Sequence, residues 1–164
     1  HWDGLFVQQT FGLLGSMDGL PDPDREPQFY EGVPARRLAA WVVDFLLVLA
    51  IGVPIAVVFG LATFGLGFAL FPMVIATVGF FYRTATIADR SATLGMRFMG
   101  IELRRSDGSR FDLMTAFLHT AIYTVAISFV FVQLASCVAI LLTRYGQGLP
   151  DIILRTTAIN RPAD

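Results

Sequence analysis

An aspartate inside an apolar segment is the residue of this sequence best suited to chemistry. Asp44 is the only side chain between Arg37 and Arg83 that we expect to carry a charge. In a membrane, an ionised carboxylate at such a position costs at least about 2.5 kcal/mol unless it is paired, protonated or hydrated. It can serve as a proton or cation site, or it can form an ion pair that fixes helix packing. We favour the ion pair, because coupled transport generally needs more ionisable groups in the membrane than one buried acid.

The spacing of the nearby arginines indicates which of them can pair with Asp44. Arg37 lies seven residues earlier, on nearly the same helix face, but the rise between the two is about 10 Å. Both side chains also lean toward the helix N-terminus. We therefore expect no direct contact between Arg37 and Asp44. Arg83 or Arg97, brought in from the loop that follows, is the expected partner.

Two other polar sets are spaced for contact along a helix. Asp151 and Arg155 lie four residues apart, which predicts a local ion pair. His119 and Tyr123 are also four apart, with Gln133 roughly on the same face. A histidine in a membrane can ligate a haem or chlorophyll metal, but without a second candidate ligand it more often hydrogen-bonds between helices. We expect the hydrogen bond.

Catalytic motifs are absent from the sequence. It contains no G-x-S-x-G, no H-E-x-x-H, no pair of cysteines and no phosphate-binding loop. The single cysteine, Cys137, lies in an apolar run and is expected to be a small core residue. We therefore predict a protein that is not an enzyme and that uses no metal and no cofactor.

The composition indicates an integral membrane protein. Charged residues make up 15% of the chain, against about 25% in soluble domains. The mean hydropathy is +0.64, and residues 113–143 contain no side chain expected to be charged. All twelve basic residues are arginine and the net charge is -1, which provides no basic field for nucleic acid. The lipid bilayer is the predicted environment.

The apolar residues predict two membrane spans, at 35–59 and 68–82, joined by a glycine-rich turn. Pro34 favours the first turn of the first helix, and Trp41 suits the headgroup level. Within this helix Gly52, Ala56 and Gly60 recur every fourth residue, a stripe of small side chains that allows another helix to pack closely. The partner is either the second span or another protein.

The third apolar region, residues 113–143, does not fit one upright crossing. As a single helix it would be about 46 Å long, and as two helices each would be about 22 Å. The arginines place the N-terminus and residues 83–112 in the cytoplasm. Arg144, Arg155 and Arg161 prefer the same side, which requires an even number of crossings. We therefore favour a bent or re-entrant hairpin over a single tilted span.

The remaining segments predict small elements at the membrane surface. We expect a strand or hairpin around residues 100–109, where alternating residues precede a turn, and a helix capped by Asp112. A short amphipathic helix at 151–155 and a strand at 156–160 should follow. Residues 1–33 are acidic and proline-rich, and we predict an irregular segment, either a solvated tail or a docking segment for a partner. Residues 1–16 lack the pattern of a secretory signal, and Met17 is an alternative start site.

Four segments resemble the RDD family, which is named for one arginine and two aspartates. Residues 37–44 (Arg-Leu-Ala-Ala-Trp-Val-Val-Asp) resemble its opening, and residues 91–97 resemble its T-L-G-K-R loop. Residues 101–108 resemble the stretch that follows, and residues 147–157 resemble the C-terminal element with the second aspartate. Met96 and Pro150 depart from the usual basic residue and histidine, so any proton or ion role of those positions does not transfer. The leader at residues 20–23 is similar to that of compact alphaproteobacterial members.

The resemblance covers residues 34–162 and implies an all-α membrane protein of the bacterial inner membrane. We expect three to four transmembrane or re-entrant helices and a small cytoplasmic cap. It marks Arg37, Asp44, Arg97 and Asp151 as a structural or ion site. We predict an accessory or assembly subunit of a larger membrane complex, respiratory or photosynthetic, with other membrane subunits as partners or a homo-oligomer. The alternative is an ion or small-solute transporter that uses Asp44.

Overall fold

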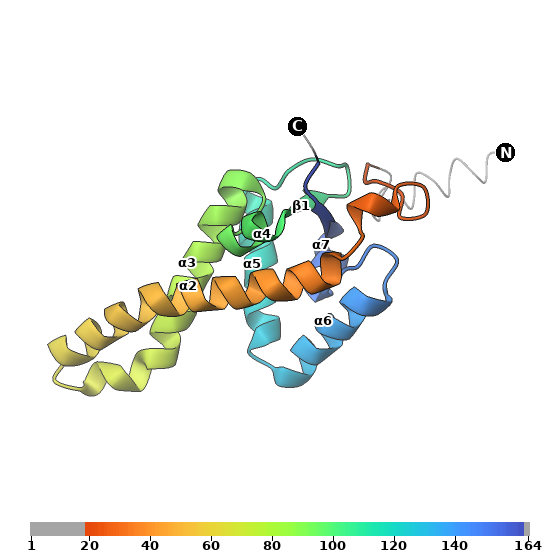
Figure 1. Ribbon diagram of the computed structural model, residues 1–164. Coiled ribbons are helices and arrows are strands. Elements are labelled where there is room, and N and C mark those ends of the chain that lie inside the picture. The colour runs from red at the N-terminus through yellow and green to blue at the C-terminus, as the bar shows by residue number, and fades with distance from the viewer. Residues whose placement is uncertain (1–18, 163–164) are drawn as a thin grey trace.

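The computed structural model describes residues 19–162, a mostly helical chain with a small sheet at one end (Figure 1). Its elements are η1 (Pro27–Phe29), α2 (Val33–Ala62), η2 (Leu66–Leu70), α3 (Phe71–Arg90), α4 (Leu94–Met99), β1 (Ile101–Arg105), α5 (Leu113–Ile127), α6 (Val130–Leu142), α7 (Leu149–Leu154) and β2 (Thr156–Asn160). The expectations for residues 1–16 lie outside the described range.

Helices α2 and α3 form an antiparallel hairpin, and both are long and apolar enough to cross a membrane. Pro34 lies in the first turn of α2, as predicted. The two helices predicted as spans are therefore present as candidate spans, but α3 runs from Phe71 to Arg90 rather than ending at Tyr82. The helix continues because Arg83, Thr84 and Ile87 are buried against other elements. The assignment of Arg83 to a loop was wrong.

The stripe of small residues on α2 packs inside the hairpin. Gly52, Ala56 and Gly60 are all buried. A Cβ atom at Gly52 would lie 2.8 Å from the Ile75 side chain of α3, and one at Gly60 would lie 2.5 Å from the Phe68 ring of η2. The second span and its connection therefore occupy the stripe. The small side chains of α2 therefore allow close packing within this chain rather than against another protein.

Helices α5 and α6 are two separate helices with a sharp bend between them. The bend is 120° at a break of two residues, Ser128 and Phe129. The pair is therefore not one continuous helix, and it is either a broken span or a re-entrant loop. Helix α5 begins where predicted, because the Asp112 carboxylate accepts a hydrogen bond from the Thr115 backbone N–H at 2.8 Å. Figure 1 shows α6 diverging from α5 and lying apart from the turn end of the α2–α3 hairpin.

The small elements α4, β1, α7 and β2, which we call the head, lie together at one end of the hairpin. A strand or hairpin was predicted around residues 100–109, and the structure has the single strand β1 there. Its partner is β2, with Ile101 opposite Asn160 and Arg105 opposite Thr156 in antiparallel register. Helix α4 was not predicted. Its N-cap is Thr93, whose hydroxyl accepts from the Met96 backbone N–H. Buried side chains from α2, α3, α5 and the head form the core between them.

Residues 19–32, which we call the strap, lie across the C-terminal part of the chain. Arg144 bonds the carboxylates of Asp22 and Asp24 at 3.0 and 2.9 Å. The Asn160 amide donates to the Gln28 and Glu31 carbonyls. This part of the acidic segment consists of turns and the short helix η1, and it lies on the C-terminal part of its own chain.

Candidate functional site

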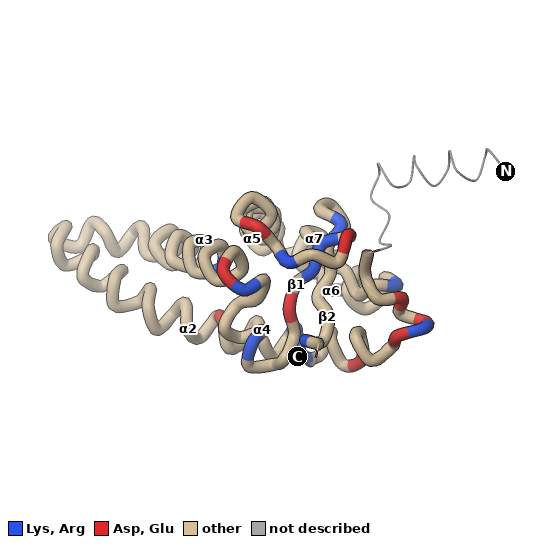
Figure 2. The backbone as a smooth tube through the Cα atoms, turned by 90° about the horizontal axis from the view of Figure 1, so that it is seen from above, with Lys and Arg blue, Asp and Glu red and all other residues tan. Residues whose placement is uncertain are grey.

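Buried polar side chains gather where the hairpin meets the head. Residues 45–81, which we call the arm, contain no charged side chain. Figure 2 shows this part of the hairpin free of acidic and basic residues, which instead lie around the head. Two buried aspartates, Asp44 on α2 and Asp151 on α7, are each the centre of a polar cluster at this junction.

Asp44 joins three elements through its carboxylate. Oδ1 accepts hydrogen bonds from the Tyr82 hydroxyl at 2.6 Å and from the Gly95 backbone N–H at 2.8 Å. Oδ2 accepts from the Thr93 hydroxyl at 2.6 Å. Asp44 is 7% exposed, so these donors replace the water that its carboxylate loses on burial. The arrangement holds α3 and the N-terminus of α4 against α2.

The local sequence allows α4 to approach α2 this closely. A Cβ atom at Gly95 would lie 2.3 Å from the Ala40 carbonyl oxygen, which belongs to the backbone and cannot turn away. Glycine at this position therefore brings its N–H within reach of Asp44. Thr93 both caps α4 and donates to the carboxylate. Both residues lie in the segment that resembles the T-L-G loop, although the residue types did not reveal their partner.

The predicted arginine partners of Asp44 were wrong. Among the described residues, neither Arg83 nor Arg97 forms an ion pair with Asp44. Arg97 lies 3.4 Å from Asp89, and Arg83 lies over the Tyr123 ring. Neutral donors take the place of the arginine, because Tyr82 on α3 and the N-terminal residues of α4 lie against the carboxylate. The sequence does not reveal Tyr82 as a partner, because an aromatic residue at the end of an apolar run also fits the headgroup level.

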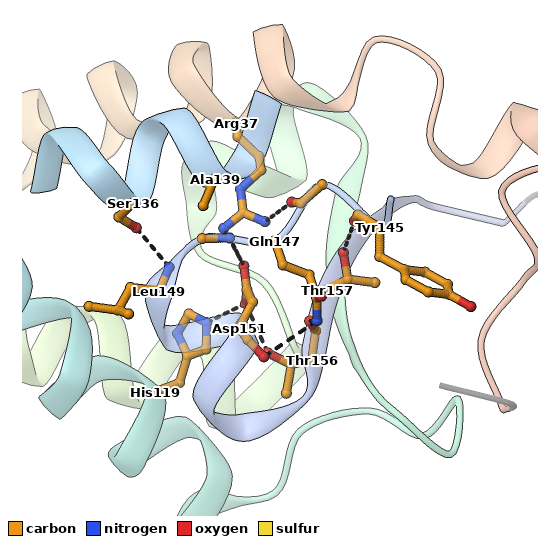
Figure 3. Close-up of polar contacts among 12 residues, drawn as sticks. Arg37, His119, Ser136, Ala139, Tyr145, Gln147, Leu149, Asp151, Thr156 and Thr157 are labelled. Atoms are coloured by element: carbon orange, nitrogen blue, oxygen red, sulfur yellow. Dashed lines mark hydrogen bonds and ion pairs between the residues drawn. The ribbon is translucent and has the colours of Figure 1, made fainter. Parts of the chain in front are cut away.

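Asp151 is the centre of the second cluster (Figure 3). Its Oδ2 accepts from the Arg37 guanidinium at 2.8 Å and from the Gly148 backbone N–H at 3.1 Å. Its Oδ1 accepts from His119 Nε2 at 2.7 Å and from the Thr156 hydroxyl at 2.8 Å. The Asp151 side chain is fully buried. Four donors from α2, α5, the start of α7 and β2 thus meet at one carboxylate.

The pKa of Asp151 reflects these donors. Burial by itself raises the pKa of this carboxyl, but Arg37 and the hydrogen bonds from His119 and Thr156 outweigh it and hold the pKa well below its usual range. Asp151 is therefore a carboxylate near neutral pH. As a carboxylate it only accepts hydrogen bonds, so the His119 contact is an Nε2–H donor. The ring joins α5 to α7, as a helix–helix hydrogen bonder does.

The local ion pair predicted between Asp151 and Arg155 was wrong. Asp151 instead pairs with Arg37 and hydrogen-bonds to His119, which are 114 and 32 residues away. Arg155 instead takes the left-handed conformation that ends α7, with φ 57°. Of the four residues marked as a possible ion site, the structure joins Arg37 with Asp151. It places Asp44 in a separate cluster, and Arg97 contacts Asp89 at the surface.

The chemistry available at these clusters is that of fixed charges and hydrogen bonds. Within residues 19–162 there is no group of three or more histidine, cysteine or acidic side chains placed to hold a metal ion. Both carboxylates have their oxygen atoms occupied by donors of the chain itself. The clusters therefore act as connections between elements.

Comparison with known proteins identifies one family. The family model described as the RDD family matches residues 32–155. No curated protein and no solved structure matches the chain. The matched segment contains every residue of the two aspartate clusters except Thr156, which follows it directly. The resemblance inferred from the four motifs is confirmed.

Proposed function

This chain belongs to the RDD family, and on that premise we propose that it is a non-catalytic accessory or assembly subunit of a larger membrane complex. The arm is the observation that supports this most. Two helices enclose no interior, so the outer faces of α2 and α3 must be covered by lipid or by helices of other subunits. Ile51, Ile55 and Val58 on α2 are 48%, 49% and 66% exposed. They lie on one face, as spacings of four and three residues require.

Solute transport needs polar groups along a path through the membrane. The arm supplies none. Its threonines, Thr63 and Thr77, donate their hydroxyls to carbonyls of their own helix or of its end. Asp44 lies at the head end of the hairpin and is held by three donors. These contacts favour a structural role for Asp44 over the alternative, a proton or cation site of a transporter.

Fewer surfaces are available to a partner than the sequence indicated. The small-residue stripe is occupied by α3 and η2, and the strap lies on the head of the same chain. We therefore propose that partner helices contact the exposed face of α2 in the arm. Respiratory or photosynthetic assemblies of the bacterial inner membrane are the proposed hosts, and a homo-oligomer would use the same face.

We also propose an orientation, with the head and residues 83–112 in the cytoplasm. The arginines around the head support it, because cytoplasmic segments of membrane proteins carry an excess of basic residues. Cysteine labelling tests this in intact cells. In a Cys137→Ser background, Ser106→Cys and Ser109→Cys should resist an impermeant maleimide until the membrane is opened. Labelling of either residue from outside would reverse the orientation.

The test of the accessory role is native electrophoresis with mass spectrometry after gentle solubilisation. We expect the chain in an assembly larger than its own dimer, with other membrane proteins present. Val58→Trp should loosen that assembly, whereas Ile153→Trp, at an exposed position of the head, is the matched control. A chain that migrates alone, or only as a homo-oligomer, would contradict the accessory role. Cation flux in proteoliposomes that disappears in a folded Asp44→Asn variant would then support transport.

A further inference from the structure

A buried arginine without an acidic partner lies beside the two aspartate clusters. Arg83, on α3, is 9% exposed. None of the ion pairs among residues 19–162 includes it, and its Nε has no hydrogen-bond partner in the described structure. Arginine remains charged in proteins, so burial without a carboxylate is unfavourable. Neither Asp44 nor Asp151 forms an ion pair with Arg83 in the described structure.

The surrounding residues hold the Arg83 guanidinium in place. It lies 4.1 Å from the centre of the Tyr123 ring, in a cation–π contact that offsets part of the cost of burial. The Tyr123 hydroxyl in turn accepts a hydrogen bond from the Trp41 indole N–H at 2.6 Å. Trp41 stacks on Phe45, with centroids 5.4 Å apart. The cation is therefore fixed in position before any ligand arrives.

Arg83 lines an open cavity of about 360 Å³ bounded by α2, α3, α5 and α6. This volume lies in the range of small-molecule sites, about 300–1,000 Å³. His119, which also lines the cavity, has a buried Nδ1 without a partner in the described structure. The other charged residues of the lining are satisfied within the protein. Arg37 pairs with Asp151, and the carboxylate of Asp44 is held by its three donors.

The remaining wall of the cavity is apolar and faces outward. Leu38 on α2 and Leu141 on α6 line it and are 65% and 72% exposed. The lining on α2 runs from Pro34 to Asp44, the end of the first span, where lipid headgroups are expected. A ligand can therefore enter sideways from the bilayer, with an apolar part against the leucines and a polar part at the arginine.

We propose that this cavity binds an anionic membrane lipid, with the phosphate of its head group on Arg83 and its acyl chain along Leu38 and Leu141. The guanidinium offers paired N–H donors that match a phosphate. The polar lining groups Gln133 and Tyr123 are placed to contact the remaining polar atoms of the head group. This proposal is independent of the accessory role, because it concerns a ligand of the chain by itself.

The first experiment uses the native cysteine as a reporter in the unaltered chain. Cys137 lines the cavity and is exposed, so the prediction of a core residue was wrong. In detergent micelles, added phosphatidylglycerol should slow its modification by N-ethylmaleimide at least threefold, whereas phosphatidylcholine with the same acyl chains should not. Equal protection by both lipids would overturn the proposal, because it would show that the acyl chain and not the acidic head is recognised. No protection by either would also overturn it.

The second experiment places the phosphate at Arg83. Native mass spectrometry should show retained phosphatidylglycerol on the wild-type chain and at least a tenfold weaker affinity for Arg83→Gln. Arg90→Gln is the matched control, since Arg90 lies on the same helix and is exposed, and it should bind like wild type. Equal affinity of the wild type and Arg83→Gln would overturn the proposal. If Arg83→Gln does not fold, Cys137→Trp, which fills the cavity from α6, must weaken binding to the same degree. Displacement of the lipid by millimolar inorganic phosphate would overturn the lipid as ligand and assign the site to a free anion.

Discussion

The arm and the head of this protein differ in where their polar groups lie and in how their parts are joined. In the arm, α2 is held against α3 and η2 by apolar packing, with close approaches at Gly52 and Gly60. In the head and where it meets α2, segments far apart in the sequence meet at buried carboxylates, Asp151 and Asp44. Lipid tolerates many apolar side chains at one position, whereas a buried carboxylate needs particular donors at particular places. Single substitutions should therefore matter far more in the head than in the arm.

The largest loss of stability should come from Asp151→Ala in the head. It removes the acceptor of four donors and leaves Arg37, whose side chain is 13% exposed, without its ion pair. We expect a loss of about 3–5 kcal/mol of unfolding free energy, the cost of leaving one partner of a buried pair alone. Thermal and denaturant unfolding in detergent micelles, followed by circular dichroism, measures it. Val58→Ala in the arm is the control and should change stability little, and a similar loss in both variants would contradict the contrast.

A smaller effect is expected where the head touches α2. Gly95→Ala places a Cβ atom 2.3 Å from the Ala40 carbonyl oxygen, so α4 must move and its bonds to Asp44 must lengthen. We expect a loss of about 1–3 kcal/mol, as for other overpacked sites. Gly79→Ala in the arm is the matched control, because its Cβ atom would meet Val48 at an ordinary 3.5 Å. That variant should be neutral or slightly more stable, since alanine favours helices. Equal melting temperatures for the two variants would show that stability does not depend on the close contact between α4 and α2.

Acid should weaken the head selectively. The folded-state pKa of Asp151 is lowered, so the stabilisation is complete above the unfolded pKa, about 3.9, and is lost as the pH falls toward the folded value. Between pH 4 and pH 3 this group should remove about 1 kcal/mol of stability. Unfolding measured against pH in wild type and Asp151→Asn tests it, since the variant lacks this titration. Parallel curves for the two proteins would assign the acid sensitivity to other groups.

The smallest effect should come from the strap. Arg144→Ala removes two exposed ion pairs, with Asp22 and Asp24, and such pairs are weak and screened by salt. We expect no resolvable change in global unfolding but faster limited proteolysis within residues 19–32. Arg161→Ala is a control, because Arg161 is exposed and forms none of these pairs. Unchanged proteolysis in low salt would indicate that the Asn160 hydrogen bonds hold the strap without Arg144.

The sequence predicted the arm well, because membrane spans follow from local properties. Apolar length, Pro34 and the absence of charge are readable without knowledge of the fold, and the Asp112 cap depends on residues three positions apart. Helix α4 was missed because six residues are too few for a periodic pattern. The extension of α3 past Tyr82 was missed because its buried polar face resembles a loop when only hydropathy is considered.

The polar clusters could be predicted only in part. The resemblance marked Arg37, Asp44 and Asp151, but it did not say which of them meet. The partners of Asp44 lie 38 to 51 residues away and that of Arg37 lies 114 residues away, so no local spacing contains them. Local rules therefore assigned Asp151 to its neighbour Arg155 and Asp44 to an arginine. Tertiary structure selected different donors for each.

The distance along the chain between Arg37 and Asp151 sets an order of events during synthesis. The partners of Asp44 emerge soon after it, so the hairpin and α4 can assemble while the rest of the chain is still being made. Arg37 must wait for 114 further residues, which takes about 6 to 23 s at bacterial to eukaryotic elongation rates of roughly 5–20 residues per second. During this interval a membrane-inserted helix carries an arginine with no counter-ion. A truncated or stalled chain keeps Arg37 without its counter-ion. Incomplete chains therefore differ from finished ones in this unpaired charge.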